Sequence, residues 1–598
     1  MGGYLVISQA LNPSVVSFCS SISPHSHLNA NSRNARHKNC PPITSAEFSV
    51  LLQSCIDAPS FDEGKRLHLQ IREAGFERNR DLLPKLIKVY SVCGRIDRAR
   101  ELFDRMPKRN LDVFVWTAIV SGYVKNGMPG EALEFFYEML KLGVNPDSYT
   151  FSALLKASAE LGLVSLIVQL HSLTVKYGVG LCLSVANSLV HAYGSFGNVY
   201  GARKVFDRME FRDVVSWSSM IHACSHVENH AESMALFSRM QFDWCLKPNE
   251  LTVVSLLPGC CFFSSLRKGQ AIHAYAIRNG FVSNVIVGSA LLTMYSRCGD
   301  PDFAYKVFSG MERRNVITWT SMIEGFALNG RFNVALNLFK VMQEQGLKPT
   351  YITLVVILSA CSHGGFVDDG LEIFETMKET FGIQPGVEHC ACVVDMLGRA
   401  GRLDDAEKFI ERMDIGPSSS VYGSLLGACQ VYHNVELGER LAQKLFELEP
   451  RNASNYVILS NIYASVGRWD DVGRVRKLMI VKGLFKESGC SWVEIKDKVY
   501  VFGAHDRTHS ESDKIYEMLE ELSDRIVKAG YVPSKKYVLL DVGEDDKKKF
   551  LCTHSERLAI AFSLLKVPPA VPIRIAKNLR VCGDCHDAIK LISKVTCR

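Results

Sequence analysis

The chain has 598 residues, of which 47% are hydrophobic and 22% charged. This composition is ordinary for a folded protein and excludes a wholly disordered one. The 69 basic and 63 acidic residues leave a net charge of only +6, so any RNA partner must be held by locally placed basic residues. The longest aliphatic stretches, such as 354–358, are far shorter than the ~18 apolar residues of a membrane span, and no membrane partner is expected.

Residues 1–44 are expected to form a leader outside the folded part. The first 46 residues contain nine serines and no Asp or Glu, together with Arg33, Arg36 and Lys38. This composition is typical of an organelle transit peptide, and a disordered tail is the alternative. We therefore predict a mitochondrial or chloroplast protein, with the mitochondrion preferred.

A repeat organises the middle of the chain. Trp116, Trp217 and Trp319 are 101 and 102 residues apart. Three histidines have nearly the same spacing, at His68, His171 and His273. These spacings indicate a super-period of about 102 residues, built from three units of about 31 to 36 residues each.

Each unit has the pattern of a helical hairpin. In unit 113–147 an apolar stripe at helical spacing begins at Trp116, and Gly127 ends that helix. A second stripe follows at Ala132, Phe135, Phe136 and Met139. One hairpin cannot bury both apolar faces, whereas stacked hairpins can, so the pattern predicts an all-α solenoid.

The unit motifs resemble those of the pentatricopeptide repeat (PPR). They are VVSWSSMI at 214–221, VITWTSMI at 316–323, and the endings GVNPD at 143–147 and GLKPT at 346–350. The tetratricopeptide signature of Trp, Leu-Gly and Tyr is absent, which disfavours a protein-interaction scaffold of that type. The alternating unit lengths resemble the plant subclass with long, short and standard repeats, in which the hairpins form a superhelix.

We divide the repeat array, residues 45–418, into three triplets and a remainder. Their ranges are 45–79, 80–112 and 113–147; 148–182, 183–213 and 214–249; 250–284, 285–315 and 316–350; then 351–386 and 387–418. Two further hairpins, at 419–452 and 453–487, resemble the helical extension motifs of the subclass.

The resemblance implies that the fifth and last residues of a unit read one base of single-stranded RNA. Thr117 with Asp147 then implies guanine, and Asn187 with Asp213 implies uracil. Adenine is implied by two pairs, Ser218 with Asn249 and Ser289 with Asn315. The alternative role for such residues at helix starts is capping.

Residues 488–598 have a different pattern, which predicts a small α/β domain. Alternation at 489–506 predicts strands, and further strands are expected at 535–542 and 571–579. Helices are expected at about 510–529, at 554–565 and from Val581.

This segment also holds a candidate zinc site. His554 and Glu556 form His-x-Glu, and Cys582 and Cys585 form Cys-x-x-Cys after 25 intervening residues. One N and two S donors suit Zn²⁺ with a fourth position for water, although Cys-x-x-Cys alone could be a structural half-site or a redox pair. The other cysteines are mostly isolated in apolar patterns and are expected in the core.

The stretches GYVPSKKYVLLDV, HSERLAIAFSLL and KNLRVCGDCHDAIKLISK resemble the DYW domain of plant PPR proteins. The resemblance implies Zn²⁺ on His554, Cys582 and Cys585, Glu556 as the proton shuttle, and no small-molecule cofactor. His586 resembles a ligand of a second zinc. The family's final His, Cys-x-Cys and Asp-Tyr-Trp are not in the sequence, so a C-terminally truncated DYW domain is expected.

The resemblance implies an organellar C-to-U RNA editing factor. Its solenoid would bind single-stranded RNA, and its C-terminal domain is a candidate zinc-dependent RNA cytidine deaminase. The alternative is a non-catalytic RNA-binding specificity factor that recruits a deaminase in trans. Editing-complex proteins are expected as further partners.

Overall fold

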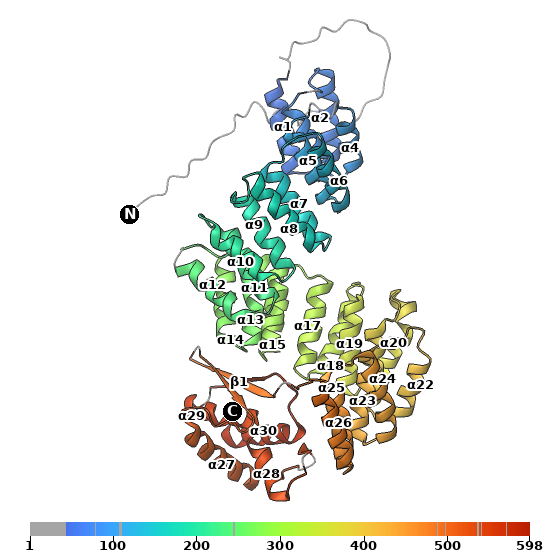
Figure 1. Cartoon of the computed structure of the whole chain (residues 1–598), viewed down its shortest axis with the longest axis vertical. Coiled ribbons are helices and arrows are strands. Elements are labelled where there is room, and N and C mark those ends of the chain that lie inside the picture. Colours follow the sequence, from blue (N-terminus) through green and yellow to red (C-terminus); the bar gives the residue numbers. More distant parts are fainter. Residues whose placement is uncertain are drawn as a thin grey trace. The chain divides into compact units, whose positions relative to one another are not determined.

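The computed structural model describes residues 43–598, except positions 78, 107–110, 243–244, 487, 497, 535–536, 540 and 570. The predicted leader, apart from its last two residues, lies outside the described residues. The described chain divides between residues 108 and 109 into two compact units. Helices are labelled in Figure 1 in chain order.

The described residues of the first unit form two helical hairpins. Its helices are α1 (Ser45–Asp57), α2 (Phe61–Glu73), α3 (Leu82–Val92) and α4 (Ile96–Asp104). The Thr44 side chain accepts a hydrogen bond from the Glu47 backbone, and the Glu47 side chain accepts one from the Thr44 backbone, so α1 begins with a capping box. Helices α1 and α3 pack together, as expected of stacked hairpins.

The second unit, taken by itself, is also built of helical hairpins from residue 113 to residue 481. Each hairpin consists of a first and a second helix. In chain order, the first helices are α5 (Val113–Lys125), α7 (Ser148–Glu160), α9 (Leu183–Ser195), α11 (Val214–His226), α13 (Glu250–Phe262), α15 (Val285–Arg297), α17 (Val316–Leu328), α19 (Tyr351–Gly364), α21 (Val387–Arg399), α23 (Ser419–Tyr432) and α25 (Ala453–Ser465).

Each first helix is followed by a second one. These are α6 (Pro129–Lys141), α8 (Val164–Lys176), α10 (Val199–Arg208), α12 (His230–Phe242), α14 (Leu266–Arg278), α16 (Pro301–Gly310), α18 (Phe332–Glu344), α20 (Val367–Phe381), α22 (Leu403–Glu411), α24 (Val435–Leu448) and α26 (Trp469–Val481), with a short 3₁₀ turn η3 (Phe281–Ser283) after α14. Every predicted unit from 45 to 487 therefore contains two helices, and the predicted helical solenoid is confirmed.

Successive first helices pack against one another without interruption from α5 to α25. Within hairpins, helices such as α5 and α6, or α11 and α12, also pack together. Gly127 follows α5 with a φ of 71°, a left-handed conformation that glycine adopts freely. The sequence correctly predicted Gly127 as the end of that helix.

Two of the three spaced tryptophans have matching surroundings. The Trp217 ring meets Phe206 edge-on at 5.0 Å between centroids, and Trp319 meets Phe308 edge-on at 4.8 Å. Arg212 and Arg314 lie over the same two phenylalanine rings, each at 4.9 Å. Trp116, Trp217 and Trp319 are all buried, so the super-period marks core positions in all three units, with matching surroundings at Trp217 and Trp319.

The C-terminal segment contains a three-stranded antiparallel sheet of order β2-β1-β3. β1 (Cys490–Ile495) and β2 (Lys498–Gly503) form a hairpin in which Ile495 pairs with Lys498. β3 (Ile575–Lys577) joins the other edge of β1, with Lys577 opposite Ser491. The sheet thus connects residues more than 80 positions apart in sequence.

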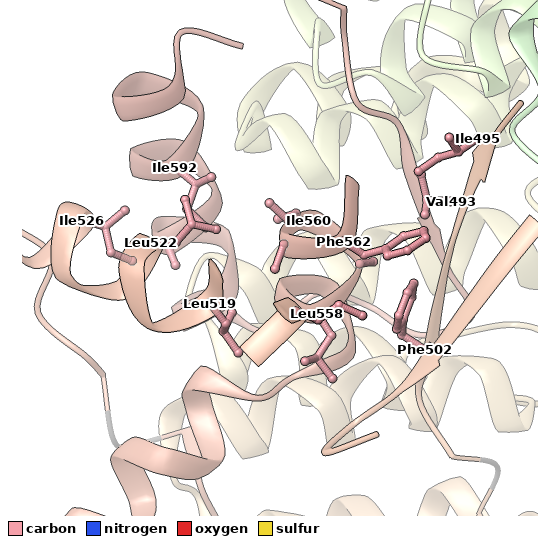
Figure 2. Close-up of a cluster of buried hydrophobic side chains, with 14 of the residues drawn as sticks. Val493, Ile495, Phe502, Leu519, Leu522, Ile526, Leu558, Ile560, Phe562 and Ile592 are labelled. Carbon is pink, nitrogen blue, oxygen red and sulfur yellow. The ribbon is translucent and has the colours of Figure 1, made fainter. Parts of the chain in front are cut away.

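Four helices accompany the sheet: α27 (Ser512–Lys528), α28 (Glu544–Cys552), α29 (Ser555–Lys566) and α30 (Gly583–Thr596). Residues 555–563 of α29 are all buried, so this helix lies at the centre of the domain. It contacts all three strands, α27 and α30. Figure 2 shows Leu558, Ile560 and Phe562 of α29 among side chains from the neighbouring elements.

Two strand predictions in this segment need correction. The described residues of 535–542 form no strand, because that alternating run finds no partner strand in the sheet. The strand predicted over 571–579 covers only 575–577, where it pairs with β1. Elsewhere, no helix among the described residues is long and apolar enough to cross a membrane.

Candidate metal centre and nucleic-acid interface

His554, Cys582 and Cys585 converge at the starts of two helices. The His554 Nδ1 atom lies 3.2 Å from the Cys585 Sγ atom and 3.5 Å from the Cys582 Sγ atom. One ligand atom from each residue lies within 4.8 Å of the other two, the only such group of three among the described residues. The structure therefore brings together the three residues that the sequence predicted as ligands.

Local structure fixes the orientation of these side chains. His554 is the N-cap residue of α29, and Cys582 is the N-cap residue of α30. The backbone N–H of Cys585 donates to Cys582 Sγ at 3.4 Å. A thiolate is favoured at a helix N-terminus, where unpaired N–H groups carry partial positive charge.

The chemistry of this donor set fits Zn²⁺. A hydrogen bond from the Cys585 thiol lowers the pKa of Cys582 to about 4, assisted by His554 and by the backbone of Cys585. The same sharing of one proton raises the pKa of Cys585. One thiolate, one thiol and one imidazole at this spacing match the N and S ligands that Zn²⁺ prefers, and metal binding would release the remaining thiol proton.

Glu556 lies in the first turn of α29 and is only 2% exposed. Burial by itself would raise the pKa of this carboxyl. A hydrogen bond from Lys577 and smaller contributions from its own backbone and from His554 outweigh burial, so the pKa of Glu556 lies below its ordinary value. The carboxylate is thus charged at neutral pH and is able to accept a proton.

The sequence did not identify Lys577 as a site residue. Its Nζ atom lies 2.5 Å from Glu556 Oε1, and the Lys577 side chain is largely buried. The partners are 21 residues apart, one on β3 and one on α29, and no motif spacing relates them. Only the pairing of β3 with β1 positions Lys577 beside the carboxylate.

A second group of buried polar residues also escaped prediction. Arg557 and Asp584 form a buried ion pair at 2.6 Å, and the Tyr531 hydroxyl donates to Asp584 at 2.8 Å. A signal was present, since Arg557 is a charged residue at the start of the mostly apolar run RLAIAFSLL. His586, predicted as a second zinc ligand, is exposed in the first turn of α30 and belongs to no three-residue ligand group in the described chain.

Three of the four residue pairs predicted to read bases are joined by a hydrogen bond, and Ser289 with Asn315 is not one of them. Thr117 donates to Asp147 Oδ1 at 3.2 Å, and Asn187 Nδ2 donates to Asp213 Oδ1 at 3.2 Å. The Ser218 hydroxyl donates to Asn249 Oδ1 at 3.0 Å. In these three units the fifth and last residues thus form one composite polar group.

The last residue of each pair also caps the following helix. Asp147 accepts from the Thr150 N–H, Asp213 from Ser216, Asn249 from Thr252 and Asn315 from Thr318. In the units of Thr117, Asn187 and Ser218, capping and pairing therefore occur together.

The four pairs differ in their exposure. Thr117 and Asn187 are half-buried, whereas Ser218 is fully buried, and its hydroxyl oxygen also lies 2.6 Å from the Val214 carbonyl oxygen, which competes for the same proton. The Ser289 hydroxyl donates to the Val285 carbonyl at 2.8 Å, and Asn315 is exposed. Of the four fifth residues, only Ser218 is fully buried, since Ser289 is half-buried like Thr117 and Asn187.

Comparison with family models covers most of the described chain. Residues 530–598 match a model described as the DYW family of nucleic acid deaminases, and residues 432–494 match the E motif. A PPR repeat family model matches 111–160 and 314–363. The PPR repeat model matches 85–111, 184–214, 215–245, 289–316, 352–379 and 390–414.

Two curated relatives come from Arabidopsis thaliana. The chloroplastic pentatricopeptide repeat-containing protein At3g57430 is 40% identical over 568 residues, which cover 92% of this chain and 64% of that protein. The mitochondrial protein At3g26782 of the same kind is 38% identical over 563 residues, covering 93% of this chain and 85% of the relative. The crystal structure of the maize pentatricopeptide repeat protein PPR10 aligns with a TM-score of 0.44 at 18% identity, covering 73% of this chain and 69% of that one.

Proposed function

Because the chain belongs to the pentatricopeptide repeat proteins with an E motif and a DYW deaminase domain, we propose that it binds single-stranded RNA sequence-specifically and deaminates cytidine to uridine in an organelle. The observation that carries this proposal is the convergence of His554, Cys582 and Cys585 beside the buried carboxylate of Glu556. This constellation is the one that zinc nucleobase deaminases use.

His554, Cys582 and Cys585 would hold Zn²⁺, which, when bound, supplies Lewis-acid activation of a water molecule. Glu556 would not be a ligand. It would accept a proton from the water and deliver it to the cytosine ring, as its low pKa and burial allow. Lys577 would hold the carboxylate in its charged form between turnovers.

The repeat array would select the RNA site. The fifth and last residues of the four assigned units predict the sequence 5′-G-n-U-A-n-A, read from Thr117 with Asp147 to Ser289 with Asn315. The hydrogen-bonded pairing within three units supports this assignment, because one base edge would then meet two side chains of fixed relative position. The relatives are named chloroplastic or mitochondrial, which favours neither organelle.

The test compares the purified full chain with Glu556→Ala and Glu556→Gln. We expect the full chain to carry one zinc and to convert a cytidine downstream of 5′-G-n-U-A-n-A in a synthetic RNA. Both substitutions should slow conversion by roughly 100- to 10,000-fold, the usual contribution of general acid–base catalysis. Zinc content, measured by mass spectrometry, and RNA affinity, measured by gel shift, should stay unchanged.

Glu520→Ala is the matched control, since Glu520 is an exposed carboxylate on α27 of the same domain. Its conversion rate should equal that of the unsubstituted chain. Zinc and RNA binding without any conversion would overturn the catalytic part of the proposal and favour a factor that recruits a deaminase in trans. Equal affinity for scrambled RNA would overturn the base assignment.

A further inference from the structure

Asp584 stands inside the Cys-x-x-Cys motif and is fully buried. Its carboxylate accepts hydrogen bonds from the Tyr531 hydroxyl at 2.8 Å, from the Ser534 backbone N–H at 2.8 Å and from Arg557 Nη2 at 2.6 Å. Arg557 is 1% exposed, and the same Nη2 atom lies 2.5 Å from the Tyr531 hydroxyl oxygen. We call Tyr531, Arg557 and Asp584 the buried triad.

Stability alone does not account for a buried ion pair of this kind. Removing two charges from water costs free energy, and a fold is often equally stable with well-packed apolar residues of similar volume in place of the ion pair. The Asp584 carboxylate accepts three short hydrogen bonds, and Arg557 Nη2 donates to both Asp584 and Tyr531, while the buried Nε atom of Arg557 has no hydrogen-bond partner among the described residues. Such networks hold their elements in one arrangement.

The triad connects the two halves of the candidate metal centre. Arg557 lies in the first turn of α29, three residues after His554 and directly after Glu556. Asp584 lies in the first turn of α30, between Cys582 and Cys585. Tyr531 and the Ser534 N–H attach the segment after α27 to the same carboxylate. The ion pair therefore joins the helix that carries the nitrogen ligand to the helix that carries both sulfur ligands.

We infer that Tyr531, Arg557 and Asp584 are positioning residues that set the distance between the starts of α29 and α30, and so fix the geometry of the metal ligands. This inference rests on the proposed metal site. Among the described residues, no hydrogen bond joins the triad to the His554 nitrogens or to the Cys582 and Cys585 thiols, so the triad acts through the backbone of the two helix starts. Residues that orient metal ligands from outside the first shell typically change metal affinity by about 10- to 100-fold when substituted.

The test uses the full chain with Tyr531→Phe, which removes only the hydroxyl, and with Asp584→Asn. Zinc dissociation constants are measured by competition with a chelator. Tyr531→Phe should weaken zinc binding about 10-fold and Asp584→Asn up to about 100-fold. Tyr516→Phe is the matched control, because the Tyr516 hydroxyl donates to the Asp506 carbonyl in the same domain without joining the triad.

Arginine substitutions provide a second, graded measurement. Arg557→Lys keeps the charge but loses the planar fork, and Arg557→Met loses both. The zinc dissociation constant should therefore rise from the unsubstituted chain to Arg557→Lys and again to Arg557→Met.

Cobalt absorption separates positioning from a purely structural role. Co²⁺ in place of Zn²⁺ gives thiolate charge-transfer and ligand-field bands that report ligand geometry, and they should shift in the triad variants but not in Tyr516→Phe. Unchanged affinity and spectra in folded Tyr531→Phe and Asp584→Asn would overturn the inference while leaving the metal site intact. An unsubstituted chain that binds neither metal would overturn the metal site and this inference with it.

Discussion

The repeat array and the C-terminal domain are stabilised by different kinds of contact. In the array one contact recurs: His68 with Tyr90, His171 with Tyr193 and His273 with Tyr295 each join an imidazole Nδ1 to a phenol oxygen at 2.9 Å. In the C-terminal domain each contact of the site occurs once, between residues up to 53 positions apart. Repetition distributes stability over many equivalent contacts, whereas the single site depends on each of its few residues.

This difference has an energetic consequence. Repeats contact mainly their neighbours, so the stability of an array is approximately a sum of local terms. A defect in one hairpin should remain near that hairpin. A defect in the buried triad or the ligand set should instead change the whole metal centre.

The largest effect is expected for Trp217→Ala. Trp217 is fully buried against Phe206, and truncating a buried aromatic side chain typically costs about 3–5 kcal/mol. Hydrogen–deuterium exchange should show lost protection in α10 to α12 and unchanged protection in α29. The exposed Phe211→Ala should change neither. Loss of protection in α29 as well would contradict the local character of the array.

Asn187→Thr should have an intermediate effect, on RNA rather than on stability. With Asp213, threonine would repeat the Thr117 and Asp147 pair, and preference at that position should move from uracil to guanine. A correct base contact typically contributes about 1–3 kcal/mol to the binding free energy. Gel-shift titration of two RNAs that differ only in uracil or guanine at this position would measure it.

Ser188→Ala is the control for this substitution. Ser188 neighbours Asn187 but donates to the Ser184 carbonyl of its own helix. Its RNA preference should remain with uracil. A parallel change of preference in Ser188→Ala would show that helix α9, and not the residue pair, sets the base.

Periodicity explains why the array could be predicted from the sequence. The spacing of Trp116, Trp217 and Trp319 reflects a local packing environment that recurs along the chain. Hairpin boundaries could therefore be predicted from apolar stripes and from glycines such as Gly127. The Gly-x-x-x-x-Ala-x-x-x-Phe pattern at 94–103, 197–206 and 299–308 needed no knowledge of distant contacts.

The candidate site was predictable only in part. His554, Cys582 and Cys585 stand in short motifs whose spacing itself has chemical meaning. Lys577 and Tyr531 do not, because their roles arise from β3 pairing with β1 and from the segment after α27 folding onto Asp584. The wrong strand at 535–542 has the same origin, since alternation marks a candidate strand but does not supply its partner.

The smallest effect is expected for Tyr295→Phe. Burial raises the pKa of Tyr295 to about 12 and lowers the pKa of His273, so the hydrogen bond joins a neutral hydroxyl and a neutral imidazole at pH 7. Losing this hydrogen bond should cost about 1 kcal/mol, measured as lost exchange protection in α14 and α15. Tyr193→Phe should cost the same in α8 and α9, and the exposed Tyr305→Phe should cost nothing.

The pH dependence sharpens this last comparison. Because folding lowers the pKa of His171 and of His273 through burial, the unfolded chain binds protons more tightly than the folded one. Their contribution to stability is therefore fully present above the unfolded histidine pKa of about 6.5 and is lost as the pH falls through the lower folded values. Protection of α8–α9 and of α14–α15 should decline together on acidification. A decline in one pair alone would show that the two histidine contacts, identical in distance, are not equivalent in energy.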